Sequence, residues 1–363
     1  MKYSILNFSN MTIGVAIIGS GIFAKEEHLP AVQLTPSLTL KAVYSRSLKS
    51  AQALSEKLTN VDLYSDDSGS GKTYHDLLLR DDIQAVIIAL PIMKQAEFIE
   101  AALTAGKHVL SEKPIAEDLK RANKLIQYYK SGKVKGGATW SVAENIRYVE
   151  AFRVGAEEVK KLGKVLGFRV KVFSNVAPGG KYFETAWRKT PEHQGGFLLD
   201  GGVHFVAATR ILLGESNKPT ALASYSALLK PHLPPVDTVN SIWQTSSGIS
   251  GTFAASFGTT FSGNGYEIAC EGGTVAVSGH GVTANVVVHK GDQRDNNIIL
   301  KKDFPDRSNG VEGEVAAWAK GIAEGKPDPM QSPEQALADL ELLEQMLVSG
   351  EKGGVQIKLE HQI

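Results

Sequence analysis

Short apolar runs alternate with amphipathic stretches along the first 140 residues. The apolar runs are rich in β-branched and aliphatic side chains, and they predict strands at Thr12–Ile18, Leu38–Tyr44, Ile83–Ala89 and His108–Leu110. Helical spacing between these runs predicts helices at Leu48–Leu58, Tyr74–Leu79, Met93–Ala105 and Asp118–Tyr129. Because strands and helices alternate, the pattern indicates a parallel sheet that is doubly wound by helices on its two faces.

The pattern changes after about residue 150, where strands follow one another without helices between them. Turns containing Gly and Ser separate predicted strands at Leu166–Phe173, Ala221–Leu229, Val236–Thr245, Ile249–Phe257, Tyr266–Cys270, Thr274–Val277 and Val282–His289. Such consecutive strands indicate a mainly antiparallel sheet. Two helices are predicted after them, at Val311–Glu324 and Pro333–Val348.

A chain of 363 residues is long enough for two domains, each with its own core. We predict an α/β protein whose first domain, residues 11–140, carries the doubly wound parallel sheet. The second domain, residues 141–363, is predicted to be α+β with a large, mainly antiparallel, open sheet. We expect its last helix to pack back on the first domain.

Charge and cysteine content exclude several classes of function. The 39 Lys and Arg residues balance 39 Asp and Glu residues, so no net field favours nucleic acid or an anionic membrane. The single cysteine, Cys270, excludes an internal disulfide framework and a multi-cysteine metal site, and it fits a reducing compartment. The histidines are scattered without an HxxxH or HExxH pair, so we expect no catalytic metal.

The N-terminal residues do not change this picture. Lys2 and the apolar stretch Ile13–Ile18 faintly resemble a secretory leader, but the stretch is too short for one. Met11 is an alternative start, which would make residues 1–10 an extension. No uncharged apolar run approaches the roughly 18–20 residues of a membrane helix. We expect a cytoplasmic protein with no membrane partner.

A glycine-rich turn directly follows the first predicted strand. Gly19-Ser20-Gly21-Ile22-Phe23-Ala24 fits the pattern GxGxxA. The first glycine permits the tight turn, the second lets the backbone approach a pyrophosphate, and the small third residue lets a helix pack on the strand. A purely structural glycine turn is the alternative. Because the turn opens the first strand–helix unit, we predict a Rossmann-type dinucleotide site.

The end of the second predicted strand indicates which dinucleotide binds. An NAD site needs an acidic side chain there for the ribose 2′-hydroxyl. This chain has Tyr44-Ser45-Arg46-Ser47 instead. The Arg46 guanidinium can pair with a 2′-phosphate and stack on adenine, while the serines donate hydrogen bonds. In the alternative interpretation Arg46 is solvated and Ser47 caps the next helix. The two interpretations can both hold. We therefore expect NADP.

Lys113, in Ser111-Glu112-Lys113-Pro114, follows another strand of the same predicted sheet. Ligands of open α/β sheets bind at the carboxyl ends of the strands. An ammonium group there can stabilise a developing alkoxide or supply a proton. A solvated lysine at a strand end is the alternative.

Several motifs in order resemble the Gfo/Idh/MocA family of NAD(P)-dependent oxidoreductases. They are the GxGxxA turn, the stretch AGKHVLSEKP over residues 105–114, LGKV over 162–165, Trp187-Arg188, and GGFLLDGGVH over 195–204. The resemblance covers nearly the whole chain and is closest to a fungal cytosolic NADP-dependent branch. It implies an N-terminal Rossmann domain and a C-terminal α/β domain whose open sheet makes a homodimer or higher homo-oligomer.

The resemblance also implies a catalytic group of Lys113, Asp200 and His204. Asp200 and His204 are four residues apart, so on a helix both project from one face. A histidine near a substrate hydroxyl can accept its proton near neutral pH, and a nearby carboxylate can raise its basicity. The alternative is an Asp200 that caps a helix above a His204 buried in the core.

The remaining expected site residues fall into two sets. For the cofactor we predict Gly19, Ser20, Gly21, Ile22, Phe23, Ser45, Arg46, Ser47, Leu90, Pro91, Glu112, Lys113, Trp187 and Arg188. For the substrate we predict Asn145, Tyr148, Lys181 and His204. The chain departs from the family pattern at Ala207, Gln95 and Phe197. The first two departures weaken any transfer of substrate identity.

We expect an NADP-dependent oxidoreductase that moves a hydride between nicotinamide and a hydroxyl or carbonyl carbon of a sugar, polyol or small carbonyl compound. A non-catalytic NADP(H)-sensing regulator on the same scaffold is the main alternative. A glycosidase that uses the cofactor in a transient redox cycle is a third reading.

Overall fold

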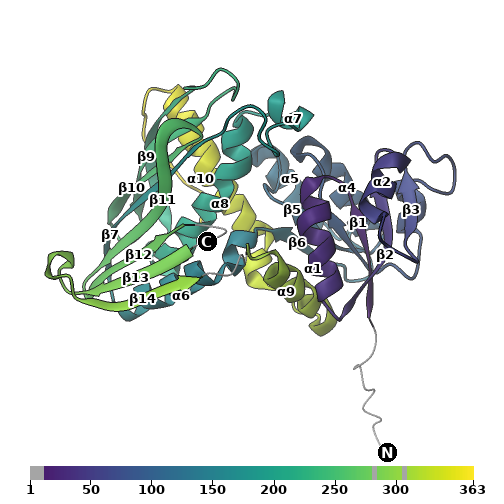
Figure 1. The fold of residues 1–363 in the computed structure, drawn as a ribbon, viewed down its shortest axis with the longest axis horizontal. Coiled ribbons are helices and arrows are strands. Elements are labelled where there is room, and N and C mark those ends of the chain that lie inside the picture. The colour runs from purple at the N-terminus through teal and green to yellow at the C-terminus, as the bar shows by residue number, and fades with distance from the viewer. Residues whose placement is uncertain (1–11, 280–283, 305–308) are drawn as a thin grey trace, which may run out of the picture.

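The computed structural model describes residues 12–279, 284–304 and 309–363. It has two lobes, each built around one β-sheet, with helices α8 and α10 between the sheets (Figure 1). The sequence positions of the alternative start, Met11 and residues 1–10, lie outside the described residues.

The first sheet is wholly parallel and has the strand order β3-β2-β1-β4-β5-β6. This is the Rossmann order, with its switch point between β1 and β4. The strands are β1 (Ile13–Ile18), β2 (Leu38–Ser45), β3 (Asp62–Ser65), β4 (Ala85–Ile88), β5 (His108–Glu112) and β6 (Trp140–Ala143). β1 and β4 are almost completely buried because helices cover both faces of the sheet. The predicted doubly wound sheet is confirmed, with β3 and β6 added.

The helices of this lobe begin and end at local signals. They are η1 (Ala24–His28, a π-helical turn), α1 (Leu29–Leu34), α2 (Leu48–Ser55), α3 (Tyr74–Leu78), α4 (Ile92–Thr104), α5 (Leu119–Lys130) and, from the end of the chain, α9 (Val311–Glu324). The Ser47 hydroxyl accepts a hydrogen bond from the Ser50 amide and so caps α2, and Asp118 caps α5 in the same way. Gly106 follows α4 with a φ of 77°, which glycine adopts without strain.

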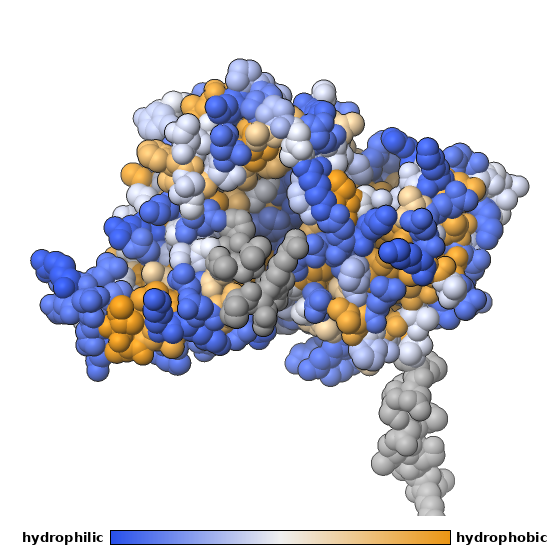
Figure 2. All heavy atoms as spheres, viewed as in Figure 1, coloured by the Kyte–Doolittle hydropathy of each residue, from blue (hydrophilic) through white to orange (hydrophobic). Residues whose placement is uncertain are grey.

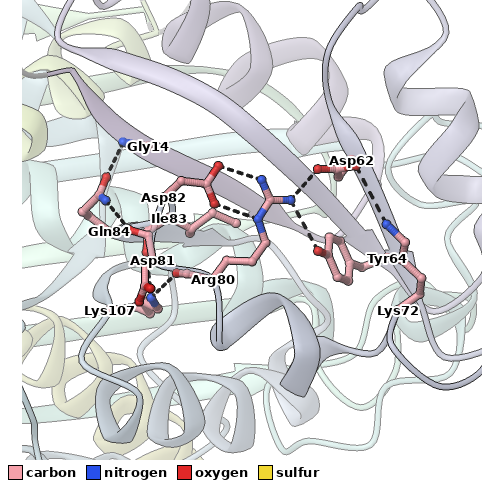
Figure 3. Close-up of polar contacts among 10 residues, drawn as sticks. All are labelled: Gly14, Asp62, Tyr64, Lys72, Arg80, Asp81, Asp82, Ile83, Gln84 and Lys107. Carbon is pink, nitrogen blue, oxygen red and sulfur yellow. Dashed lines mark hydrogen bonds and ion pairs between the residues drawn. The ribbon is translucent and has the colours of Figure 1, made fainter.

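Polar contacts hold the amino-terminal edge of the parallel sheet, opposite the site described below (Figure 3). The Gly14 amide donates to Oε1 of Gln84 at 2.7 Å, joining β1 to the segment before β4. The Arg80 guanidinium contacts Asp82 through two nitrogens, at 2.8 and 2.7 Å, and Asp62 through Nη1 at 2.6 Å. Nζ of Lys107 donates to two backbone carbonyls of the same loop. These contacts fix the loop between α3 and β4.

The second sheet has nine strands in the order β14-β13-β12-β11-β7-β10-β9-β8-β15. All neighbours are antiparallel except β10 and β7, so the predicted mainly antiparallel sheet is confirmed. Its strands are β7 (Val165–Asn175), β8 (Pro219–Ala227), β9 (Thr238–Thr245), β10 (Ser250–Ser256), β11 (Gly258–Cys270), β12 (Gly273–Ser278), β13 (Ala284–Lys290), β14 (Ile298–Phe304) and β15 (Ile357–Lys358). Residues 282 and 283, at the start of the strand expected over Val282–His289, lie outside the described residues.

Helices α6 (Glu150–Lys161), α8 (Gly196–Leu213) and α10 (Pro333–Glu351) pack on one face of this sheet, and its other face is open (Figure 1). Shorter helical turns are η2 (Asn145–Tyr148), α7 (Ala186–Lys189), η3 (Glu215–Asn217), η4 (Gln293–Asp295) and η5 (Pro329–Gln331). Among the described residues, α8 is the one helix long and apolar enough to cross a membrane, but 78% of it is buried inside the protein. It is the core helix of the second lobe.

The two lobes share helices and buried charges. α10 packs on α8 and β8 of the second lobe and also on α5 and β6 of the first. Asp339 of α10 forms buried ion pairs with Arg147 of η2 and, at 2.6 Å, with Arg210 of α8. β6 spans Trp140–Ala143, so the parallel sheet extends three residues past residue 140, at which we expected the first domain to end.

Candidate active site

A cavity of about 880 Å³ opens at the carboxyl ends of β1, β2, β4 and β5 and is closed on its other side by α7 and α8. This is where ligands bind in open α/β sheets, at the strand-order switch point. It is lined by Gly19, Ser20, Gly21, Ile22, Phe23, Ala24, Tyr44, Ser45, Arg46, Ser50, Asp66, Ala89, Leu90, Pro91, Ile92, Lys94, Glu97, Phe98, Glu112, Lys113, Tyr182, Thr185, Ala186, Trp187, Arg188, Phe197, Asp200, Gly201 and His204.

The two glycines of the turn, Gly19 and Gly21, are needed for different reasons. Gly19 has a φ of 110°, and a Cβ there would lie 2.2 Å from the Ala89 carbonyl oxygen. No side chain can be placed at this position without moving β4. A Cβ on Gly21, by contrast, would meet no protein atom within 4 Å. Gly21 therefore leaves room in the cavity itself, as a close approach of a phosphate to the backbone requires.

The end of β2 forms the far wall of the cavity. The Ser20 hydroxyl donates to Oγ of Ser45 at 2.6 Å, which ties the glycine turn to β2. Arg46 lines the cavity and is exposed. Ser47 does not line it, because its hydroxyl caps α2. The Tyr44 hydroxyl donates to Asp66 at 2.5 Å, and burial together with this carboxylate raises the Tyr44 pKa well above its ordinary value.

Three charged groups meet at the opposite end of the cavity. Nζ of Lys113 donates to the Asp200 backbone oxygen at 2.9 Å and to its Oδ1 at 3.1 Å. Nε of Arg188 donates to Oδ2 of Asp200 at 2.7 Å. Burial disfavours the Asp200 carboxylate, but the two cations outweigh it and hold the pKa of Asp200 well below its ordinary value. Asp200 is therefore an anion that holds two cations in place.

His204 projects from α8 one turn after Asp200, and both side chains line the cavity. Its Nδ1 lies 2.5 Å from Oε1 of Glu144, which is fully buried at the end of β6. Burial opposes ionisation of Glu144, but the neighbouring His204, Lys113 and Arg147 keep the pKa of this carboxyl below its usual value. The carboxylate that contacts His204 is thus Glu144, whereas Asp200 contacts Lys113 and Arg188.

Glu112, next to Lys113, also lines the cavity. Its Oε1 lies 2.7 Å from Nε2 of His28, a buried residue of the π-helical turn η1. The Phe23 ring stands edge-on to the His28 imidazole, with the ring centroids 5.3 Å apart. The turn that follows the glycine motif therefore fixes a carboxylate at the cavity wall.

Aromatic rings hold the Arg188 guanidinium. Its Cζ lies 4.0 Å from the centroid of the Trp187 ring and 5.5 Å from that of Tyr182. Nη1 of Arg188 also donates to the Thr185 hydroxyl at 3.2 Å. Cation–π contacts of this kind restrict the side chain, so Arg188 is a fixed rather than a mobile charge.

Three residues expected at the substrate do not line the cavity. Nδ2 of Asn145 donates to the Asn309 carbonyl at 2.5 Å, and the Tyr148 hydroxyl donates to Asp328 at 2.8 Å. Nζ of Lys181 forms an ion pair with Glu26 of η1. Because η2 turns its side chains toward α9 and η5, Asn145 and Tyr148 join the lobes together instead of facing the cavity.

Two family models match consecutive parts of the chain. The family model described as "Oxidoreductase family, NAD-binding Rossmann fold" (Gfo/Idh/MocA) matches residues 13–137. Its companion model, "Oxidoreductase family, C-terminal alpha/beta domain", matches residues 156–359.

Individual proteins extend the similarity over the whole chain. Dehydrogenase FPY6 from Fusarium mangiferae is 42% identical over 342 residues, which are 93% of this chain and 96% of that protein. A 1,5-anhydro-D-fructose reductase from Ensifer adhaerens is 24% identical over 89% of this chain and 92% of its own. The crystal structure of an oxidoreductase from Thermotoga maritima has a TM-score of 0.82 at 30% identity, covering 96% of this chain and 98% of that one.

Proposed function

Because the chain belongs to the Gfo/Idh/MocA family of oxidoreductases, we propose that it is an NADP-dependent enzyme that moves a hydride between nicotinamide and a hydroxyl or carbonyl carbon. The observation that carries the proposal is the meeting of Lys113, Asp200 and His204 on one wall of a cavity that begins at the glycine turn. The proposed substrates are sugars, polyols or small carbonyl compounds, and the similarity to a 1,5-anhydro-D-fructose reductase supports this class.

The cavity suits a dinucleotide phosphorylated on its adenosine ribose. The amides of the glycine turn would hold the pyrophosphate, where a Cβ on Gly21 would intrude. Arg46 and Ser45 at the end of β2 would hold the 2′-phosphate, because no acidic residue stands at those positions to bind a 2′-hydroxyl. The bound cofactor would supply or accept the hydride at C4 of its nicotinamide ring.

His204 would act as the general acid and base. Glu144 would accept a hydrogen bond from Nδ1–H, which would leave the Nε2 lone pair for a substrate in the cavity that His204 lines. During oxidation Nε2 takes the proton of the substrate hydroxyl, and the Glu144 anion stabilises the imidazolium that forms. During reduction the same proton returns to the substrate oxygen.

Lys113 would stabilise charge on that oxygen. An ammonium group has three N–H donors, and the backbone oxygen and Oδ1 of Asp200 accept from Nζ. A further N–H is available to a substrate carbonyl or alkoxide in the cavity, whose developing negative charge it stabilises. Asp200 would position Lys113 and Arg188 and would take no part in the proton transfer.

The test is a panel of sugars, polyols and aldehydes assayed with NADPH and NADP at the absorbance band of the reduced nicotinamide. Lys113→Ala and His204→Ala should each lose turnover while keeping affinity for NADPH. Unchanged turnover in both variants would overturn the mechanism. Tight NADPH binding without turnover on any substrate would instead favour a regulator, and glycoside cleavage with no net absorbance change would favour the cofactor-dependent glycosidase.

We further propose that the open face of the nine-stranded sheet joins two or more copies of the chain. Tyr225 and Ile242 are exposed on strands whose alternate residues face the helices. At the sheet edge Ile298 and Ile299 of β14 are exposed. Figure 2 shows apolar side chains gathered at the lower left of the molecule, where Figure 1 places β13 and β14. Light scattering should give a dimer or larger assembly that Ile242→Lys dissociates, and a monomeric wild-type protein would overturn this. The proposed cytoplasmic location is tested by fractionation of cells.

A further inference from the structure

Helix α9 begins directly behind the catalytic wall. Nδ2 of Asn145 donates to the Asn309 carbonyl, and a Cβ on Gly310 would lie only 2.1 Å from the Asn145 backbone oxygen. Glu314 lies in the first turn of this helix, with 0% of its surface exposed. Helix α9 packs on η2, and η2 starts immediately after Glu144.

Glu314 is surrounded by charges that belong to the site. Burial raises its pKa well above the ordinary value, and Glu112 and Glu144 raise it further, while the cations Arg147 and Lys113 offset only part of this. Arg147 is already paired with Asp339. Burial and the two neighbouring carboxylates thus favour the protonated, neutral form of this carboxyl group.

Tyr148 of η2 also faces Glu314, and its own pKa is raised by burial, by Asp328 and by Glu314. It therefore stays a neutral phenol and brings no further charge to Glu314. Gln331 of η5 approaches α9 from the other side, where its Nε2 donates to the Glu314 backbone carbonyl at 2.9 Å. Asp328, the N-cap of η5, accepts the hydrogen bond of the Tyr148 hydroxyl.

Three buried carboxylate oxygens have no hydrogen-bond partner among the residues that the structure describes. They are Oε1 and Oε2 of Glu314 and Oε2 of Glu144. A protonated carboxyl group has one O–H to donate, and a carboxylate oxygen can only accept. The donor and the acceptor are therefore complementary, and a buried polar group left unpaired is costly.

We propose that Glu314 is a positioning residue that donates its carboxyl proton to Oε2 of Glu144, directly or through one water molecule. This bond holds Glu144 as the anion whose other oxygen, Oε1, fixes His204 in the Nδ1–H form. The proton stays on Glu314 throughout the reaction, so no step consumes it. The inference rests on the proposed function because it assigns His204 its role as base.

The first test compares Glu314→Gln with Glu314→Met in the full chain. The glutamine amide can still donate to Glu144, so activity and its pH dependence should match the wild type. Methionine has a similar length and no donor, and the loss of a hydrogen bond to a charged group predicts a fall in kcat/KM of about 10- to 100-fold. Without the donor the pKa of Glu144 rises, so the acid limb of the pH profile should move to higher pH.

Gln331→Met is the matched control because it likewise replaces a buried polar side chain with methionine, at a neighbour of Glu314. It should lower thermal stability and leave the pH profile in place. Equal pH profiles for Glu314→Met and the wild type would overturn the proposal, as would equal impairment of Glu314→Gln and Glu314→Met in folded proteins.

A second measurement does not depend on turnover. The ¹⁵N signals of His204, assigned with His204→Asn, should show the Nδ1–H form in the wild type and in Glu314→Gln, and a mixture of both forms in Glu314→Met. Identical spectra in all three proteins would overturn the positioning role. Failure of the proposed function would look different. The wild type would then show no NADP(H) binding or turnover, while the His204 signals would still differ between the wild type and Glu314→Met.

Discussion

Nδ1 of His204 lies 2.5 Å from Oε1 of Glu144, although the two residues come from different lobes of the molecule. Glu144 directly follows the last strand of the parallel sheet, and His204 lies on the core helix of the antiparallel lobe. The proposed general base is therefore assembled only when the two lobes are docked. Its basicity and orientation depend on a residue of the dinucleotide-binding lobe.

Replacing Glu144 with glutamine should abolish the anion while keeping the shape of the side chain. We expect kcat to fall by about 10²- to 10⁴-fold, because the imidazolium loses its counter-charge and the ring its orientation. NADPH affinity, measured by fluorescence titration, should stay within twofold. Glu150→Gln, an exposed neighbour on α6, is the control. Wild-type turnover in Glu144→Gln would contradict the assignment of His204 as base.

Arg46→Ala should change the choice of cofactor more than it changes activity. A charge-assisted hydrogen bond to a phosphate contributes about 1.5–3 kcal/mol, so the ratio of the Kd values for NAD and NADP should fall by about 10- to 100-fold. Lys49→Ala, on the exposed surface of α2, should leave this ratio unchanged. Isothermal titration with both cofactors measures it. An unaltered ratio in Arg46→Ala would reject its contact with the 2′-phosphate.

The two glycines of the turn should respond differently to the same substitution. Gly19→Ala places a methyl group 2.2 Å from the Ala89 carbonyl and forces a positive φ on alanine, so we expect a lower melting temperature together with weak cofactor binding. Gly21→Ala meets no protein atom and should melt like the wild type, yet it should bind NADPH weakly because the methyl group enters the cavity. Calorimetry and titration on both variants provide the check. Full NADPH affinity in Gly21→Ala would show that the phosphates lie elsewhere.

Asp200 should make the stability of the protein depend on pH in the acid range. Lys113 and Arg188 hold its pKa in the folded state below the ordinary value of 3.8. Its contribution to folding is therefore complete above that value and is lost as the pH falls below it toward the folded-state pKa. The free energy of unfolding in urea should fall more steeply between pH 4.5 and about pH 3 in the wild type than in Asp200→Asn, by at most about 1.4 kcal/mol per pH unit. Parallel curves would contradict this.

The parallel sheet could be predicted because the sequence pattern of its inner strands is typical of strands that are buried on both faces. β1 and β4 are short runs of buried aliphatic residues, and the glycine turn marks where the first of them ends. β3 (DLYS) and β6 (WSVA) were missed because polar residues interrupt them, whereas the equally short β4 is wholly aliphatic. β14 was missed because almost every position on it is exposed. α8 is buried on nearly all sides and contains three glycines, so it lacks the polar face by which a helix is recognised. α6 does have such a face, with Phe152, Gly155 and Val159 buried, and its periodicity should have found it.

Site residues could be predicted where a sequence motif indicates both the residue type and its position in the fold. Lys113, Asp200 and His204 do meet at the cavity, as their motifs indicated, although their chemical roles remain predictions. The partner of His204 could not be found from spacing, because Glu144 lies 60 residues away in the chain. The one available signal was its position after β6, at the same sheet edge as Lys113. Asn145 and Tyr148 follow it in sequence, but the turn of η2 directs them to α9 and η5.

The packing of helix α10 on both lobes determines how the protein would behave if it were cut into fragments. It packs on α5 and β6 as well as on the second sheet, and its Asp339 neutralises Arg147 and Arg210 from opposite sides of the junction. A fragment cut near residue 140 would lose the outermost parallel strand and uncover the apolar side of α5. The recombinant first half should thus be insoluble or molten, and the intact chain should melt in a single cooperative step.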